Sequence, residues 1–321
     1  MSPAVPTTTA RRCANISVMS STAGPHPKSG PILVTGGTGT LGRLVVPRLR
    51  EAGREVRVLS RQGREAVEGV EFVTGDLATG EGVEAAVEGA EIVLHCAGSS
   101  KGDEVKAENL VRAASGAGAR HLVYISVVGA DRIPVDSRVD GAMFAYFASK
   151  LAAERVVADS GLPWTTLRAT QFYDLILLVA RQLAKLPVIP VPTGFRFQPI
   201  DAEDVAARLV ELALGTPAGL VPDIGGPRVY GAAELLRGYL RAGGKRRLMM
   251  PVPLPGKAAG AIRAGANLTP EGAVGRRTWE EFLAERVGRS AVSRSTAPAQ
   301  APVRRRSCRK GFPLRDDLRA E

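Results

Sequence analysis

Two periods of apolar residues alternate along residues 31–170. Short apolar runs typical of buried strands are separated by segments in which apolar residues recur at helical spacing. Strands are predicted at 32–35, 55–60, 70–77, 90–100, 121–129 and 162–170, and helices at about 40–53, 81–89, 101–117 and 142–160. Strands that are joined through helices of this length lie parallel in one sheet. The pattern therefore predicts an α/β fold with a doubly wound parallel sheet.

The alternation becomes looser after residue 170. The remaining pattern predicts helices at 172–185, 201–214 and 231–242, strands at 194–200 and 219–225, a proline-rich stretch at 187–193, a turn-rich stretch at 249–257 and an amphipathic segment at 279–286. We expect about 171–286 to form a small C-terminal substrate lobe on a dinucleotide-binding domain that spans 31–286.

The two ends of the chain differ in composition from this body. Residues 1–30 are rich in Pro, Thr, Ser and Gly without periodicity, and residues 287–321 are basic and of low complexity. Such composition predicts a disordered leader and a disordered tail. Translation can begin at Met1 or at Met19, which directly precedes a short lead-in to the first strand.

The charge distribution, the cysteine content and the lack of long apolar runs exclude several classes of partner and site. The net charge is +11, but residues 1–30 contribute +3 and residues 287–321 contribute +6, which leaves only +2 for the body. We therefore expect no nucleic-acid partner. The three cysteines lie far apart, so neither a metal site nor a disulfide framework is expected. No apolar run is long enough for a signal peptide or a membrane span, and we expect a cytoplasmic protein without a membrane partner.

A glycine-rich turn follows the first predicted strand. In 31–43, PILVTGGTGTLGR, Gly36, Gly39 and Gly42 are spaced three residues apart, and a helix follows. Unpaired N–H groups and the positive dipole end at a helix start attract phosphate, and glycine lets a pyrophosphate approach the backbone. Because this turn opens a βαβ alternation, it predicts a dinucleotide site.

The residue after the second strand bears on which dinucleotide binds. An acid there would bond the ribose 2′-hydroxyl of NAD, whereas an arginine can pair with the 2′-phosphate of NADP. The chain has Arg61 and no acid at this position, which favours NADP over NAD, although Arg61 can also be a solvated surface residue. Asp76 can bond the adenine amino group or cap the following turn. Ala97 and Gly98 permit close approach of the chain to the cofactor.

Tyr146 and Lys150 form a Tyr-x-x-x-Lys pair that shares one helical face. A nearby ammonium is expected to lower the pKa of the phenol, so that the pair can exchange a proton with a carbonyl or an alcohol. Ser126 falls at the end of the fifth strand, where it can bond a substrate oxygen or satisfy its own loop.

These motifs together resemble the atypical, NmrA-like branch of the short-chain dehydrogenases/reductases over about 31–286. The matching segments are TGGTGTLG, the arginine after the second strand, GDL, YISVVGAD, YFASKLAAERVVADSGLPWTTLRATQF and QPIDAEDVA. The resemblance implies a Rossmann-type fold with a substrate cleft under the C-terminal lobe. It also implies that Tyr146 is the acid/base, that Lys150 holds the nicotinamide ribose and that Ser126 orients the carbonyl. Val127 and Val128 follow Ser126 in place of the serine cluster that is common in catalytic members.

We therefore predict an NADPH-dependent oxidoreductase that acts on a small carbonyl, alkene or quinone. The alternative is a non-catalytic NADP-binding sensor, because the NmrA-like branch contains such proteins. Phe144, Phe147, Phe172 and Phe195 can line the substrate pocket or pack in the core. The predicted cofactor-binding residues are Gly36, Thr38, Gly39, Thr40, Leu41, Gly42, Arg61, Asp76, Leu77, Ala97, Gly98 and Lys150.

Overall fold

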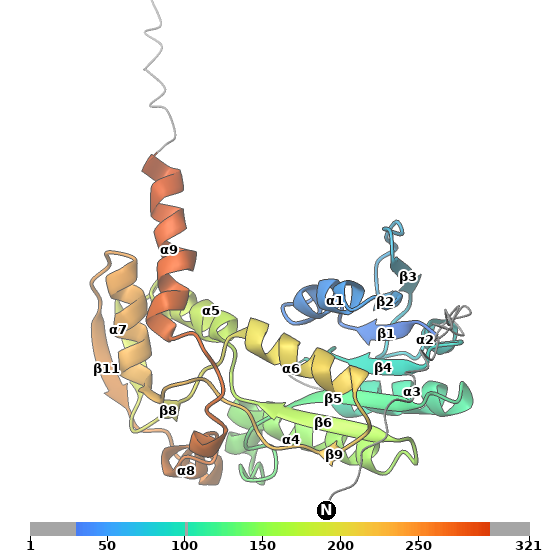
Figure 1. Cartoon of the computed structure of the whole chain (residues 1–321). Coiled ribbons are helices and arrows are strands. Elements are labelled where there is room, and N and C mark those ends of the chain that lie inside the picture. Colours follow the sequence, from blue (N-terminus) through green and yellow to red (C-terminus); the bar gives the residue numbers. More distant parts are fainter. Residues whose placement is uncertain (1–29, 100–101, 296–321) are drawn as a thin grey trace, which may run out of the picture.

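The computed structural model describes residues 30–99 and 102–295. Its centre is a parallel sheet, as the alternation predicted, and the strand order is β3-β2-β1-β4-β5-β6-β9 (Figure 1). The strands are β1 (Ile32–Thr35), β2 (Val56–Ser60), β3 (Val70–Thr74), β4 (Ile92–His95), β5 (His121–Val127), β6 (Trp164–Ala169) and β9 (Gly219–Leu220). The order reverses between β1 and β4, and such a switch point opens a crevice at the carboxyl ends of the strands.

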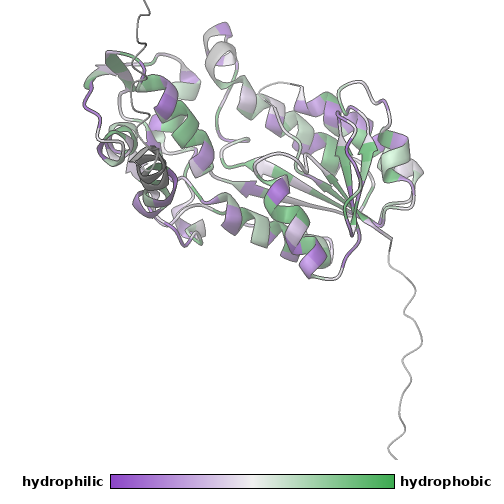
Figure 2. Cartoon of the chain, turned by 90° about the horizontal axis from the view of Figure 1, so that it is seen from above, coloured by the Kyte–Doolittle hydropathy of each residue, from purple (hydrophilic) through white to green (hydrophobic). Residues whose placement is uncertain are grey.

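Helices cover both faces of this sheet. On one face lie α1 (Gly42–Glu51) and α6 (Ala202–Leu214), and on the other lie α2 (Val83–Val87), α3 (Asp103–Gly116) and α4 (Arg138–Ala158). Every side chain of β1 is fully buried between these layers, which explains why its sequence is a continuous apolar run. Figure 2 shows the hydrophobic strands at the centre and hydrophilic residues on the outer sides of the helices.

The C-terminal lobe has its own core. It contains α5 (Tyr173–Leu183), α7 (Ala232–Ala242), α8 (Lys257–Ala264), the 3-10 helix η1 (Pro270–Gly272), α9 (Trp279–Ser295), the parallel pair β7 (Val188–Pro192) and β11 (Leu248–Val252), and the antiparallel pair β8 (Arg196–Phe197) and β10 (Tyr230–Gly231). Tyr173, Trp279 and Phe282 pack together at its centre, with ring centroids 5.1 to 5.7 Å apart. Aromatic packing thus joins α9 to α5.

Residues 171–286 do not all belong to this lobe. Asp201 accepts a hydrogen bond from the Glu203 N–H at 3.0 Å and so caps α6, but α6 then packs against α1 beside the main sheet. β9 pairs with β6 as the last strand of that sheet. The reason is the apolar face of α6, including Val205 and Leu209, which is buried in the same core as β1.

Two proline-containing stretches of the C-terminal lobe form strands that the sequence did not predict. The stretches at 187–193 and 249–257 were expected to be irregular, but residues 188–192 and 248–252 pair as parallel strands. A strand that has a free edge tolerates proline, because the missing N–H is not needed there. Pro190, Pro192 and Pro251 lie in such a pair. Ile189 and Val191 are buried in the lobe core.

The predicted start of the C-terminal tail also needs correction. Residues 287–295 continue α9, so the expectation that the tail begins at 287 was wrong for these residues. Proline first recurs at Pro298, so nothing in 287–295 other than Gly288 opposes the helix. The leader through residue 29 and the tail from residue 296 lie outside the described residues. In the part that is described, no helix is long and apolar enough to cross a membrane.

Candidate functional site

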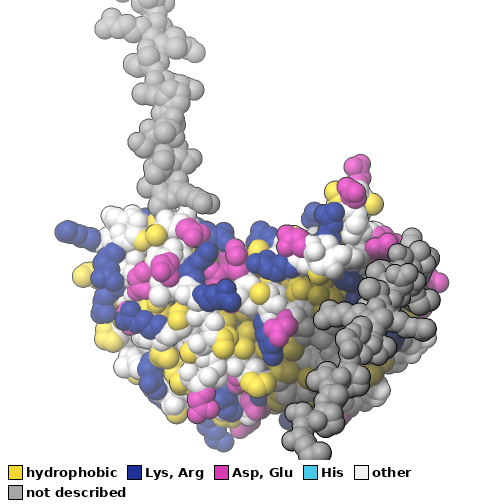
Figure 3. Space-filling view, viewed as in Figure 1, with side chains coloured by type: hydrophobic (Ala, Val, Ile, Leu, Met, Phe, Trp, Pro, Cys, Tyr) yellow, Lys and Arg dark blue, Asp and Glu magenta, His cyan; other side chains and the backbone are white. Residues whose placement is uncertain are grey.

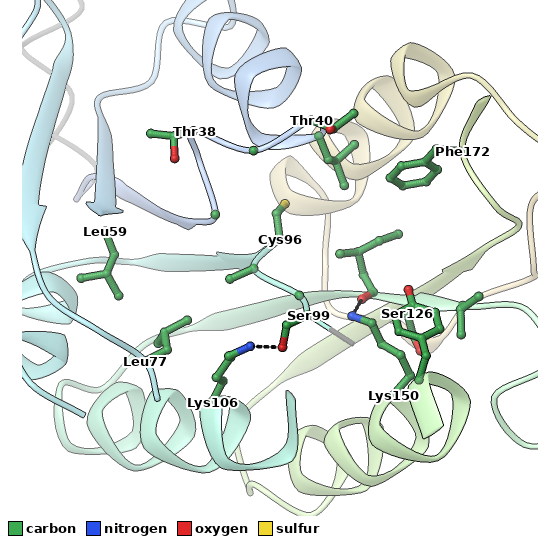
Figure 4. A pocket seen from close by; sticks show the side chains of 18 of the residues that line it. Thr38, Thr40, Leu59, Leu77, Cys96, Ser99, Lys106, Ser126, Lys150 and Phe172 are labelled. Carbon is green, nitrogen blue, oxygen red and sulfur yellow. Dashed lines mark hydrogen bonds between the residues drawn. The ribbon is translucent and has the colours of Figure 1, made fainter. Parts of the chain in front are cut away.

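A cavity of 580 Å³ lies along the carboxyl edge of the sheet, at the switch point (Figure 4). It is lined by every residue that the sequence analysis assigned to the cofactor or to catalysis except Gly42. In Figure 4, Leu59 and Thr38 lie toward one end of the cavity, and Ser126 and Lys150 lie toward the other. The volume and the elongated shape suit a dinucleotide with room for a small substrate.

The glycines of the turn have separate structural tasks. Gly36 has a φ of +68°, and a Cβ there would lie 2.7 Å from the backbone nitrogen of Ala97. Gly42 lies outside the cavity, and a Cβ there would collide with the carbonyl oxygen of Gly36. It therefore permits close packing of α1 under the turn rather than contact with a nucleotide. The first turn of α1 carries no acid, so no negative charge opposes a pyrophosphate at the positive end of the helix dipole.

The end of the cavity near β2 provides the residues expected around the adenosine. Arg61 is exposed and lines the cavity, and among the described residues it makes no ion pair. Asp76 accepts a hydrogen bond from the Ala78 N–H at 2.9 Å, so it caps the following turn, which was one of its two predicted roles. It also lines the cavity, so capping does not remove it from the nucleotide site.

Lys150 is held rigidly beneath the other end of the cavity. It is 3% exposed, and its ammonium lies 3.1 Å from the Asp103 carboxylate. The ammonium also donates hydrogen bonds to the Tyr124 hydroxyl and to the Ile125 carbonyl, each at 3.2 Å. Burial lowers the pKa of Lys150, and the adjacent Asp103 opposes this change. Three elements, α3, α4 and β5, thus fix one buried cation.

Tyr146 does not have the lowered pKa that the sequence analysis expected. Desolvation, followed by the charge of Asp103, raises the pKa of Tyr146 to about 12, although 37% of the residue is exposed at the cavity. The Lys150 ammonium lies 5.9 Å from the Tyr146 ring centroid, and Asp103 compensates its charge. The phenol is therefore protonated at neutral pH, a state that donates a proton but does not accept one.

Ser126 is a polar group that lacks a partner in the described part of the chain. Its side chain is 4% exposed, lines the cavity, and its hydroxyl makes no hydrogen bond to any described residue. Leaving a buried hydroxyl unpaired costs about 1–3 kcal/mol, so such groups usually face a ligand or water. The alternative in which Ser126 satisfies its own loop is not what the structure shows.

The structure adds residues that the sequence analysis missed. Lys106 of α3 lines the cavity, lies 3.2 Å from the carboxylate of the fully buried Asp103 and also donates to the Ser99 hydroxyl. Asp103 stands in the first turn of a helix, where an acid is common for reasons of capping and dipole. Nothing in the sequence distinguishes it from such an acid, because its partner lies 47 residues along the chain.

Of the four phenylalanines considered for the substrate pocket, only Phe172 lines the cavity. Phe144, Phe147 and Phe195 are buried in the core of the C-terminal lobe. Cys96 also lines the cavity, and burial raises its pKa to about 12, so it stays a thiol.

Known proteins resemble the chain in this same region. The sequence profile of a family described as NAD(P)H-binding matches residues 36–214. A ceramide reductase of Caulobacter vibrioides is 33% identical over 264 residues, which cover 75% of this chain and 80% of the relative. An NAD(P)H azoreductase of Xenophilus azovorans is 29% identical over 221 residues, which cover 67% of this chain and 74% of the relative.

A solved structure shows the same fold. The NADPH complex of an NADPH-dependent quinone oxidoreductase from Escherichia coli superposes with a TM-score of 0.67 at 19% identity, covering 79% of this chain and 99% of that one. The chain belongs to the NAD(P)H-binding family, within the atypical short-chain dehydrogenase/reductase class that its motifs resemble. It is an NAD(P)-binding oxidoreductase with a Rossmann-type fold, as predicted.

Proposed function

We propose that the protein reduces a small carbonyl, alkene or quinone with NADPH, and that Tyr146 is the proton donor. The observation that carries the proposal is that Tyr146, Lys150 and the unpartnered Ser126 hydroxyl line the same cavity as the glycine turn and Arg61. The names of the relatives support it, since they include reductases of a ceramide and of azo compounds.

In a carbonyl reduction, Tyr146, Ser126 and Lys150 would each have a different role. Bound NADPH supplies the hydride that the carbonyl carbon receives. Tyr146 donates its phenolic proton to the carbonyl oxygen, so that hydride and proton together convert the carbonyl to an alcohol. Ser126 donates a hydrogen bond to the same oxygen, which satisfies its buried hydroxyl. Lys150 stays beside Asp103 and exchanges its hydrogen bond to the Tyr124 hydroxyl for one to the ribose of the nicotinamide half.

The preference for NADP over NAD is part of this proposal and rests on Arg61. Replacing Arg61 with Ala should weaken NADPH binding by roughly 10- to 100-fold, because hydrogen bonds to a charged phosphate contribute about 1.5–3 kcal/mol. NADH affinity should change little. Fluorescence titration with both nucleotides measures the two constants, with Arg64→Ala as a control for a nearby exposed arginine that does not line the cavity. Equal losses for both nucleotides would show that Arg61 does not distinguish them.

The raised pKa of Tyr146 predicts an asymmetric dependence on pH. Reduction needs the protonated phenol, and with a pKa of about 12 that form dominates up to about pH 10, so kcat for reduction should stay flat between about pH 7 and 10. Oxidation of the alcohol needs the phenolate, so its kcat should rise about tenfold per pH unit over the same interval. Saturating rates in both directions test this expectation. A reduction rate that falls with an apparent pKa near 7 would contradict it.

A further inference from the structure

Exposed apolar side chains gather along one edge of the C-terminal lobe. Among the described residues, thirteen large apolar side chains are exposed, and seven of them belong to α5 or to the β7–β11 pair and the turn before it. We call these seven the apolar strip: Leu175, Leu178 and Val179 of α5, with Leu186, Val188, Leu248 and Met250. Scattered exposed apolar residues need no explanation, but a contiguous group marks an interaction surface.

The strip is continuous in space. Leu175, Leu178 and Val179 share one face of α5 by their spacing of three and four residues, and Leu186 follows in the turn after the helix, where its N–H donates to the Leu183 carbonyl at 3.0 Å. Val188 is paired in register with Leu248, and Leu248 shares a surface hollow with Lys185, Arg246 and Arg247. Leu175 also lines the cofactor cavity. The strip thus runs from the mouth of the cavity to the outer edge of the lobe.

Cations predominate in the two segments that carry the strip, and Asp174, the acid directly before Leu175, lies 3.8 Å from Arg286. Residues 175–192 and 241–256 contain six cations and no acid, although residues 31–286 as a whole carry only +2. The rest of the body is therefore net negative, at −4. In the part of the chain that the structure describes, none of the six pairs with a carboxylate. They are Arg181, Lys185, Arg241, Lys245, Arg246 and Arg247.

We propose that this edge docks on the surface of an anionic lipid bilayer. Apolar side chains that enter the headgroup region, flanked by cations that attract anionic lipid, are the combination that holds a protein at a membrane surface without a spanning helix. β11 lies at the outer edge of the lobe, away from the central sheet, and Figure 3 shows Lys and Arg side chains beside apolar ones along that edge. The lack of an apolar run long enough to span a bilayer predicted no membrane partner, but a docking surface needs no such run.

A second copy of the chain fits this edge less well. In a two-fold dimer the same surface is present on both partners, so the six unpaired cations would face six like charges. An anionic bilayer instead complements every one of them. The proposal concerns binding, so it is separate from the reductase chemistry proposed above.

Co-sedimentation of the full chain with vesicles tests the proposal. The wild type should bind vesicles of phosphatidylcholine mixed with phosphatidylglycerol, and bind phosphatidylcholine alone far more weakly. The double variant R246E/R247E should lose roughly tenfold or more of the partition coefficient, since each surface cation contributes about a fivefold factor. L248S/M250S should make the remaining binding more sensitive to salt. NADPH titration of each variant shows that it is folded.

Matched control variants change residues on other surfaces. Every protein compared keeps the basic tail, so the tail cannot account for a difference between them. R112E/R155E changes two exposed arginines of α3 and α4, and L214S/L220S changes two other exposed leucines, so both should bind vesicles as the wild type does. Failure of the wild type to bind anionic vesicles would overturn the proposal, and so would unchanged binding of R246E/R247E and L248S/M250S. A concentration-dependent dimer in sedimentation velocity that L248S/M250S abolishes would assign the strip to a second copy instead.

Discussion

Replacing Tyr146 with Phe should lower kcat for NADPH-dependent reduction by roughly 10²- to 10⁴-fold, the usual contribution of a positioned general acid. NADPH affinity should change little, because the ring remains against the cavity wall and only the hydroxyl is lost. The measurement is the rate of NADPH oxidation with a panel of aldehydes, ketones, enones and quinones. Tyr239→Phe provides the control, since Tyr239 is buried in α7 and does not line the cavity.

Two outcomes would reject this role for Tyr146. An active wild type whose rate survives Tyr146→Phe would leave the reductase proposal standing with a different proton donor. A wild type that binds NADPH but reduces nothing in the panel would favour the non-catalytic cofactor sensor.

Replacing Lys150 with Met should lower the free energy of unfolding by about 2 kcal/mol at neutral pH, because the fully buried carboxylate of Asp103 then loses its buried counterion and keeps only Lys106, 3.2 Å away. The double variant D103N/K150M should recover much of this loss, since the buried negative charge is then removed as well. Urea unfolding of the wild type and both variants measures the coupling. If the double variant is as unstable as the single one, Asp103 and Lys150 are not coupled.

The same pair has a characteristic dependence on pH. Burial alone would raise the pKa of Asp103, but Lys150, with Ser99 and Lys106, holds it below its ordinary value. In the wild type this carboxylate therefore stabilises the fold above about pH 4, and the contribution is lost as pH falls through the lowered pKa. In Lys150→Met the pKa should instead be raised, so the deficit relative to the wild type should shrink as pH falls from about 7 to 5.

The sequence was sufficient for six of the seven strands of the sheet and for most of the cavity wall. The turn containing Gly36, the strand-end residues Ala97 and Gly98, and the helical pair Tyr146 and Lys150 all follow from local pattern and strand order. Parallel strands end at one edge of a sheet, so residues at several strand ends meet there regardless of their separation in sequence.

What the sequence did not predict depends on tertiary neighbours. Asp103 resembles an ordinary first-turn acid until α3 and α4 pack together and place it beside Lys150. For the same reason the expected direction of the Tyr146 pKa shift was wrong, since the shift depends first on desolvation in the folded protein and then on a carboxylate from another helix. The β7–β11 pair was missed because proline conceals an edge strand, and its exposed apolar face was missed with it.

A crystal structure of the protein with bound NADPH tests the central proposal most directly. We expect the pyrophosphate at the N-terminus of α1, the 2′-phosphate at Arg61, and the nicotinamide between Ser126 and Lys150. The Tyr146 hydroxyl should then lie within about 3–3.5 Å of an oxygen position above nicotinamide C4. A nicotinamide ring turned away from Ser126, or a Tyr146 hydroxyl beyond reach of that position, would contradict the proposed reduction.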